Sequence, residues 1–195
     1  MLKVGVTGGI GSGKSTVCQL FKCLEIPVFN ADEAGRYLLS EDKDVLEQVK
    51  SIFGQEVIIH GKPDRKKLAG IVFNNAEKLA QLNAVIHPAV RNYYASWAIE
   101  QQSPYVIYEA AILFETGLYK QLDYTALVVA PESLRIKRVM ERDGTDEANV
   151  RARIKNQWSD EDKNKLTNFL VVNDDVTPLL PQVMDIHNQL IVKTT

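Results

Sequence analysis

A glycine-rich segment near the N-terminus has the residue types and spacing needed to hold phosphate groups. Residues 8–15 read GGIGSGKS, and Gly8, Gly13, Lys14 and Ser15 satisfy the pattern G-x-x-x-x-G-K-[ST]. Glycine tolerates the backbone dihedrals and the crowding that arise when several N–H groups point at one polyphosphate. The segment therefore predicts a binding site for a nucleoside triphosphate.

Each residue of this phosphate-binding loop has an expected role. Lys14 is expected to reach the β- and γ-phosphates of ATP, and Ser15 to place its hydroxyl on Mg²⁺. Thr16 is expected near the α-phosphate. The predicted nucleotide-binding set comprises Gly9, Gly11, Ser12, Gly13, Lys14, Ser15 and Thr16.

The residues on either side of the loop predict the elements that position it. Leu2, Val4 and Val6 indicate a short apolar strand before the loop. After Lys14 the apolar residues recur at helical intervals, which predicts a helix whose positive dipole end faces the phosphates. Strand, loop and helix in this order are the context in which the motif is credible.

Four further apolar segments predict the rest of a sheet, at residues 27–30, 105–109, 125–129 and 169–172. Helical patterns separate them, one after Pro131 and a last one over residues 179–191. Alternating strands and helices favour a parallel sheet with right-handed crossovers. The predicted fold class is therefore α/β, a three-layer α/β/α arrangement around a five-stranded parallel sheet.

A long helical stretch interrupts this alternation between the second and third strands. A helix through residues 33–39 is followed by a break and a new helix cap at Ser40-Glu41-Asp42, and then by an amphipathic helix ending near Gly54. Residues 56–62 predict a hairpin or an irregular turn, and residues 63–102 are helical. Breaks are expected at Asn74-Asn75 and at His87-Pro88. We interpret residues 1–35 and 104–195 as a nucleotide-binding core and about 36–103 as an insertion that binds the acceptor, all within one domain.

Residues from about 143 to 166 predict a short, charged helical lid before the last strand. Asp143-Gly144-Thr145-Asp146 ends one helix, and Asp146 is expected to cap the next. Arg142 and Arg153 are the candidates for contacts with ATP, although a solvated helix face is an equal alternative for either arginine. A closing lid would exclude water from the reaction.

The composition excludes several classes of protein. The net charge of −2 offers no basic field for nucleic acid, and no apolar run is long enough for a membrane span. The first strand begins at Leu2, so no signal peptide is expected. Cys18 and Cys23 lie on different faces of one helix and predict reduced thiols in or near a core. Together these observations favour a cytoplasmic protein, expected as a monomer or weak homo-oligomer.

Asp32 is the candidate for the acid that acts on the acceptor. It follows the second strand, at the sheet edge where the loop also lies. There it could orient an acceptor hydroxyl and take its proton. The alternative is that Asp32 only caps the following helix. A GTPase is disfavoured because Asn164-Lys165-Leu166-Thr167 lacks the aspartate of N-K-x-D.

Over essentially its whole length the chain resembles the dephospho-coenzyme A kinase family. The resemblance is carried by VGVTGGIGSGKSTV at residues 4–17, by Asn30-Ala31-Asp32, by Asp64-Arg65 with Leu68 and Val72-Phe73, by His87-Pro88, by EAAILFE at residues 109–115, by Arg153 and Gln157, and by Asn173. The chain departs from the family pattern where Asn30 and Glu109 replace aspartates, Ala111 replaces proline, and Asn168 replaces aspartate.

The resemblance implies that ATP, with Mg²⁺, phosphorylates the ribose 3′-hydroxyl of dephospho-coenzyme A to give coenzyme A and ADP. It implies catalytic roles for Lys14, Asp32 and Arg142, with Arg153 as a further ATP contact. The implied acceptor-binding residues are Asp32, His87, Glu109, Phe114 and Glu115. Core packing for Phe114, a surface charge for Glu115 and a helix-boundary position for His87 are their structural alternatives.

Two other functions remain open from the residues. A kinase for a nucleoside or a nucleoside monophosphate would share the loop and differ in the insertion. A nucleotide-dependent switch would bind a triphosphate without an acceptor. Asp32, together with an insertion large enough to hold an acceptor, argues against the switch.

Overall fold

The chain folds into two compact units. The computed structural model describes residues 1–59, 61–73 and 75–194. One unit, the sheet unit, comprises Met1–Asn30 and Gln101–Thr195, and the other, the insertion, comprises Ala31–Glu100. Each unit has its own core, so each is described by itself.

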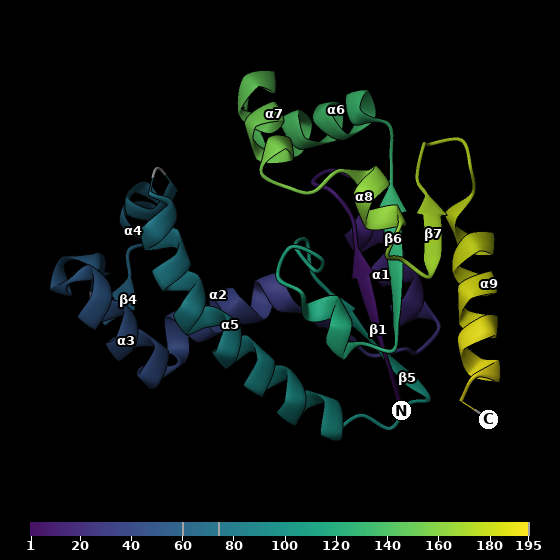
Figure 1. The fold of residues 1–195 in the computed structure, drawn as a ribbon, viewed down its shortest axis with the longest axis horizontal. Helices are drawn as coiled ribbons and strands as arrows, with labels where there is room; N and C mark the ends of the chain where they lie inside the picture. Colours follow the sequence, from purple (N-terminus) through teal and green to yellow (C-terminus); the bar gives the residue numbers. More distant parts are fainter. Residues whose placement is uncertain (60, 74, 195) are drawn as a thin grey trace. The chain divides into compact units, whose positions relative to one another are not determined.

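The sheet unit is built on five parallel strands (Figure 1). The strands are β1 (Leu2–Thr7), β2 (Val28–Asn30), β5 (Tyr105–Glu109), β6 (Tyr124–Val129) and β7 (Phe169–Val172), in the spatial order β2-β5-β1-β6-β7. Every residue of β5 is buried, as expected for an apolar strand inside a parallel sheet. The predicted α/β fold with a five-stranded parallel sheet is confirmed.

Two helices cover one face of this sheet. α1 (Lys14–Cys23) and α9 (Leu179–Val192) pack on alternate strand residues such as Val4 and Val6, which form one apolar core with Phe21 and Ile186. On the opposite face, the segment after β5 approaches the sheet closely. A Cβ atom on Gly5 would lie 2.6 Å from Leu113 Cδ2, so a side chain at this position would require the Leu113 side chain to move.

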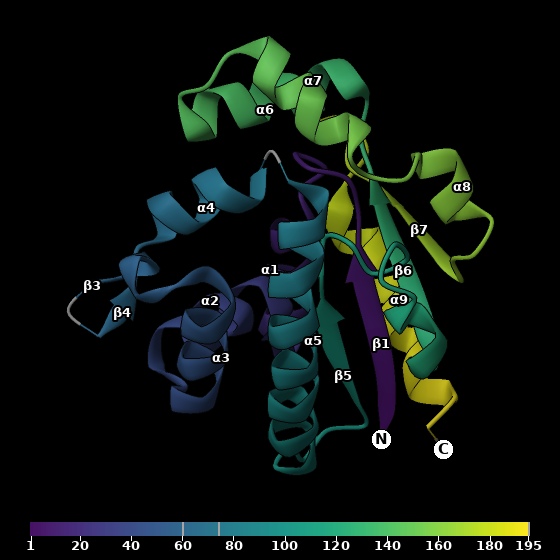
Figure 2. The same ribbon diagram turned by 60° about the vertical axis from the view of Figure 1, so that its left-hand side comes forward.

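Three helices follow β6 and lie near the carboxyl ends of the strands. They are α6 (Glu132–Asp143), α7 (Glu147–Lys155) and α8 (Asp160–Asn164). Figures 1 and 2 both show α6 and α7 beyond the end of the sheet that is opposite to the N-terminus. Asp146 accepts a hydrogen bond from the Asn149 N–H at 2.8 Å, which confirms its predicted capping role.

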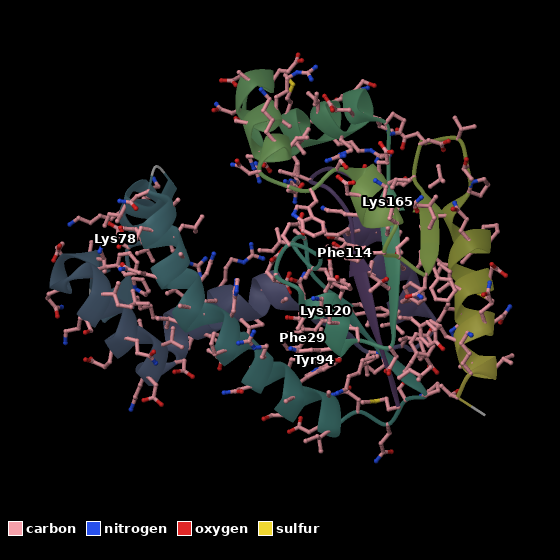
Figure 3. All side chains as sticks on the ribbon, viewed as in Figure 1. Phe29, Lys78, Tyr94, Phe114, Lys120 and Lys165 are labelled. Carbon is pink, nitrogen blue, oxygen red and sulfur yellow. The ribbon has the colours of Figure 1, made fainter. Side chains whose placement is uncertain are left out.

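The insertion is almost entirely helical. It contains α2 (Ala31–Glu41), α3 (Lys43–Phe53), the 3-10 turn η1 (Gln55–Val57), the two-stranded hairpin of β3 (Ile58–Ile59) and β4 (Lys62–Pro63), α4 (Arg65–Phe73) and α5 (Ala76–Ile99). Its core includes Val49, Phe53, Leu68 and Val85. Lys78, labelled in Figure 3, lies 5.5 Å from the centre of the Phe53 ring.

The predicted break at His87-Pro88 is wrong. α5 continues from Ala76 to Ile99 with Pro88 inside it, although an interior proline removes one helical hydrogen bond and costs about 3 kcal/mol. Val85 is buried before the proline and Val90 after it. Because both halves of α5 bury apolar residues, tertiary packing outweighs the local cost.

Other local predictions have mixed outcomes. Asp42 caps α3 as expected, and its side chain accepts from the N–H groups of Asp44 and Val45. Cys18 is buried, but Cys23 is exposed, so the prediction that both thiols lie in or near a core is wrong for Cys23. Of the predicted break at Asn74-Asn75, Asn74 lies outside the described residues, and Asn75 caps α5.

Among the described residues, no helix is both long enough and apolar enough to cross a membrane.

Candidate active site

The phosphate-binding loop closes tightly between β1 and α1. The Ser12 N–H donates to the Gly9 carbonyl at 3.0 Å, and the Thr16 N–H donates to the Gly13 carbonyl. Gly13 has a φ of 89° and immediately precedes α1. A side chain at this position would meet the Asn173 amide nitrogen at 2.0 Å, so both its dihedral and its surroundings require glycine.

α1 begins at Lys14, and its first turn carries the predicted phosphate-binding side chains. Ser15 and Thr16 are both exposed there. Because the N–H groups of a first helical turn lack partners within the helix, they attract an anion, and the helix dipole favours it further. The structure therefore brings Lys14, Ser15 and Thr16 to one helix N-terminus, as the sequence predicts.

Glu109 connects this helix end with the neighbouring strand. Its carboxylate is buried at the end of β5. The Ser15 hydroxyl donates to Glu109 Oε1 at 2.9 Å, and the Asn30 amide donates to Oε2 at 3.1 Å. Both departures from the family pattern, Asn30 and Glu109, therefore meet beside Ser15 in one hydrogen-bonded cluster.

The Cys18 thiol lies in the same cluster. Burial raises the pKa of Cys18 well above its ordinary value, and the negative charge of Glu109 and a hydrogen bond with it raise that pKa further. The thiol therefore stays protonated and acts as a donor to Glu109. This arrangement excludes Cys18 as a thiolate nucleophile.

Residues far along the chain hold the outer side of the loop. The Asn173 amide donates to the Ser12 carbonyl at 2.8 Å, and Arg138 donates to the Gly11 carbonyl at 3.4 Å. Arg138 also donates to the Asn173 carbonyl at 3.2 Å. Asn173, directly after β7, is thus a structural support of the loop.

Arg135 is a residue of this region that the sequence analysis missed. It is 6% exposed on α6, it donates through Nε to the Ile10 carbonyl at 3.0 Å, and it pairs with Asp160 at 3.0 Å. The sequence does contain a pattern that could have indicated a buried role for Arg135. Arg135 lies four residues before buried Val139 on α6, and a charged residue on the apolar face of a helix usually has a buried partner.

The two arginines predicted to contact ATP meet at one carboxylate. Arg142 binds Asp143 through two hydrogen bonds of 2.7 and 3.1 Å, and Arg153 binds the same side chain at 2.7 Å. Hydrogen bonds from both arginines lower the pKa of Asp143 well below its usual range. Two cations on one anion leave this group of three side chains with a net positive charge.

Phe114 and Glu115 are both engaged within the sheet unit. Phe114 is labelled in Figure 3 on the segment after β5 and is 1% exposed, packed against Tyr119. Glu115 pairs with the fully buried Lys163 at 2.9 Å and accepts from the Trp158 N–H at 3.0 Å. These contacts account for the two residues as structural elements, and their predicted contact with an acceptor stays a prediction.

Asp32 and His87 belong to the insertion. Asp32 is exposed in the first turn of α2, directly after β2 ends at Asn30. His87 is half-buried on α5, and burial, followed by the charge of Arg91, lowers the pKa of His87. The predicted roles of both residues toward an acceptor stay predictions.

Comparisons with known proteins agree along nearly the whole chain. The family model described as dephospho-CoA kinase matches residues 2–178. A dephospho-CoA kinase from Bacteroides fragilis is 34% identical over 186 residues, which cover 95% of this chain and 91% of that relative. A crystal structure of a Thermus thermophilus protein is similar with a TM-score of 0.86 at 34% identity, covering 100% of this chain and 98% of that one. A dephospho-CoA kinase from Campylobacter jejuni has a TM-score of 0.70 at 26% identity, with 99% and 98% covered.

Proposed function

The chain belongs to the dephospho-CoA kinase family, and we propose how its own residues carry out the phosphorylation that ends CoA biosynthesis. In this reaction the γ-phosphoryl group of ATP passes to the ribose 3′-hydroxyl of dephospho-CoA, which yields CoA and ADP. Such a transfer has a loose transition state, so positioning and charge stabilisation supply most of the catalysis.

The phosphate-binding loop and α1 hold the ATP phosphates in this proposal. Gly9, Gly11, Ser12 and Gly13 form the backbone cradle, and Thr16 adds a contact to the α-phosphate. Lys14 binds the β- and γ-phosphates and offsets the charge that develops during transfer. The position of Lys14 in the first turn of α1 supports this role.

Mg²⁺ fits the oxygen ligands that lie beside this loop. The Ser15 hydroxyl and the Glu109 carboxylate are 2.9 Å apart, and oxygen ligands are those that Mg²⁺ prefers. We propose that Ser15 binds the ion together with ATP and that Glu109 orients the Ser15 hydroxyl. When bound, Mg²⁺ neutralises charge on the β- and γ-phosphates.

Asp32 is proposed to act on the acceptor. As an exposed carboxylate in the first turn of α2, it can accept the proton of the ribose hydroxyl and orient that hydroxyl for in-line attack. The insertion, through His87, and the segment with Glu109, Phe114 and Glu115 are proposed to bind the rest of dephospho-CoA.

Arg142 and Arg153 are proposed as the cations of the lid. Their shared contact with Asp143 keeps both guanidinium groups together at the end of α6. From there they can bind ATP phosphate or adenine, and lid closure limits ATP hydrolysis by water. We further propose a cytoplasmic protein that acts as a monomer or weak homo-oligomer and binds neither nucleic acid nor membrane.

The observation that carries the proposed mechanism is the hydrogen bond from Ser15 to buried Glu109 at the N-terminus of α1. The test measures ADP release from ATP and Mg²⁺ with dephospho-CoA, adenosine or a nucleoside monophosphate as acceptor, with the product identified by mass spectrometry. Turnover with dephospho-CoA alone is expected. Turnover with a monophosphate would reassign the acceptor, and ADP release without any acceptor would favour a nucleotide switch.

A further inference from the structure

Ile10 is the residue through which the phosphate-binding loop is attached to the helices that follow β6. Its N–H donates to Gln157 Oε1 at 2.9 Å, and its carbonyl accepts from Arg135 Nε at 3.0 Å. Its side chain packs on the small apolar cluster of Ile136, Val139 and Val150. Both backbone polar groups and the side chain of one loop residue therefore contact α6, α7 and the residues that follow them.

Arg135 controls the direction of a neighbouring N–H group. The Ile10 carbonyl and the Gly11 N–H belong to one peptide unit, and in a trans peptide they point in opposite directions. Because the Arg135 guanidinium binds this carbonyl, the Gly11 N–H points away from that guanidinium. In the proposed function, Gly11 belongs to the backbone cradle whose N–H groups face the ATP phosphates.

The guanidinium group of Arg135 is itself tightly held. It is 6% exposed and pairs with Asp160 at the start of α8. It also fills the space beside Gly9, where a Cβ atom would lie 2.1 Å from Arg135 Nη2. Its rotamer is therefore held by two parts of the sheet unit outside its own helix, namely the loop and α8.

We propose that Arg135 is a positioning residue for ATP. It orients the Ile10–Gly11 peptide so that the Gly11 N–H faces the phosphates, and through its pair with Asp160 it couples this peptide to α8. Gln157 holds the preceding Gly9–Ile10 peptide through the Ile10 N–H. The inference rests on the proposed role of the loop in ATP binding. Arg135 does not itself touch the nucleotide.

The test compares two variants that disturb the same contact from opposite sides. Arg135→Lys keeps the charge that Asp160 needs but lacks the planar fork that also reaches Ile10. Gly9→Ala leaves Arg135 intact but places a methyl group where the guanidinium lies. Gly9 is not among the glycines with a positive φ, so alanine meets no left-handed backbone there. Arg151→Lys is the matched control, because Arg151 is exposed on α7 and pairs only at the surface with Glu132 and Glu147.

For Arg135→Lys we expect the KM for ATP, and its Kd in equilibrium titration, to rise roughly tenfold or more. The KM for dephospho-CoA should stay within about twofold. Amide hydrogen exchange in the peptide that contains residues 8–13 should become faster. Gly9→Ala should change the same quantities in the same direction. In the double variant, the fold-increase in the ATP Kd should be smaller than the product of the two single-variant increases.

An unchanged ATP Kd in folded Arg135→Lys would overturn the inference, and so would equal changes in the KM values of both substrates. If Arg135→Lys does not fold, Asp160→Asn decides by the same criteria, because it removes the ion pair that holds the Arg135 guanidinium and is not part of the proposed ATP site. The ATP Kd and the hydrogen exchange do not depend on the acceptor. A wild-type protein inactive on dephospho-CoA would therefore refute the proposed function and leave this inference to be judged by its own measurements.

Discussion

The phosphate-binding loop and the insertion are stabilised in different ways. The loop backbone is held by side chains that are 125 to 161 positions away in the chain, namely Arg135, Gln157 and Asn173. In the insertion, helix-capping hydrogen bonds span two or three residues, as at Asp42, Asp64 and Asn75. An apolar core joins its helices.

This difference predicts different consequences of mutation. A polar contact to the loop determines where N–H groups point, so its loss should change ATP binding and turnover more than the free energy of unfolding. A contact in the insertion core contributes mainly buried apolar area, so its loss should change the free energy of unfolding more than the chemistry. Five measurements test this contrast, from the largest expected effect to the smallest.

Lys14→Ala should have the largest effect, on the loop side of the comparison. Loss of the cation that binds the β- and γ-phosphates is expected to lower kcat/KM by roughly 10³-fold or more. The melting temperature without ATP should change little. Lys22→Ala, at the exposed C-terminal end of the same helix, should retain activity. Near-normal turnover of Lys14→Ala would contradict the assignment of the loop.

Phe53→Ala should have the converse effect in the insertion. Phe53 is buried in the core of that unit, and its truncation should lower the free energy of unfolding by about 3–5 kcal/mol. Urea denaturation measures this change, and kcat of the folded protein should stay within a few-fold. Lys50→Ala on the same helix should change stability by less than about 0.5 kcal/mol. A Phe53→Ala protein that is stable but inactive would contradict the expectation that the insertion core affects the free energy of unfolding more than turnover.

Asp32→Asn tests an exposed residue of the insertion for a chemical role. If the carboxylate takes the proton of the acceptor hydroxyl, kcat should fall by about 10²-fold while the Kd for ATP is retained. Asp44→Asn, in the first turn of α3, is the matched control and should leave kcat unchanged. A kcat within a few-fold of the wild type would return Asp32 to a helix-terminal role.

Asp42→Ala measures how much local capping contributes in the insertion. The two hydrogen bonds that its side chain accepts at the start of α3 should be worth about 1 kcal/mol. Urea denaturation should show that loss, and the KM for ATP should not change. Glu47→Ala, at an exposed position on the same helix, should be close to neutral. An altered ATP KM would show that the insertion and the nucleotide site are not separable.

The pH dependence of His87 should be the smallest effect. Because burial and Arg91 lower the pKa of His87 in the folded state, the unfolded chain binds its proton more readily than the folded chain. Stability from neutral His87 is therefore present above the ordinary pKa of about 6.5 and is lost as the pH falls below it. Urea denaturation at pH 8 and pH 5.5 should show this loss, and His87→Gln should reduce it. An identical pH dependence in both proteins would contradict the prediction.

Local sequence determined the elements that carry the loop. Alternating apolar residues predicted β1, and the helical spacing of Val17 and Phe21 predicted α1. Continuous apolar runs identified the strands of the parallel sheet, including the fully buried β5. The glycine pattern with Lys14 and Ser15 predicted the proposed phosphate site, because the motif is one continuous segment of the chain.

Only the tertiary structure decided which residues hold that site in place. Arg135 reaches Ile10, and Glu109 receives the hydrogen bonds of Ser15 and Asn30, because the fold brings these distant segments together. The same is true of Pro88, which local propensity marks as a break and which packing keeps inside α5. Neither outcome could be derived from local pattern, since hydrogen-bond partners and burial depend on contacts between residues far apart in the chain, whereas propensity and periodicity act within a few residues.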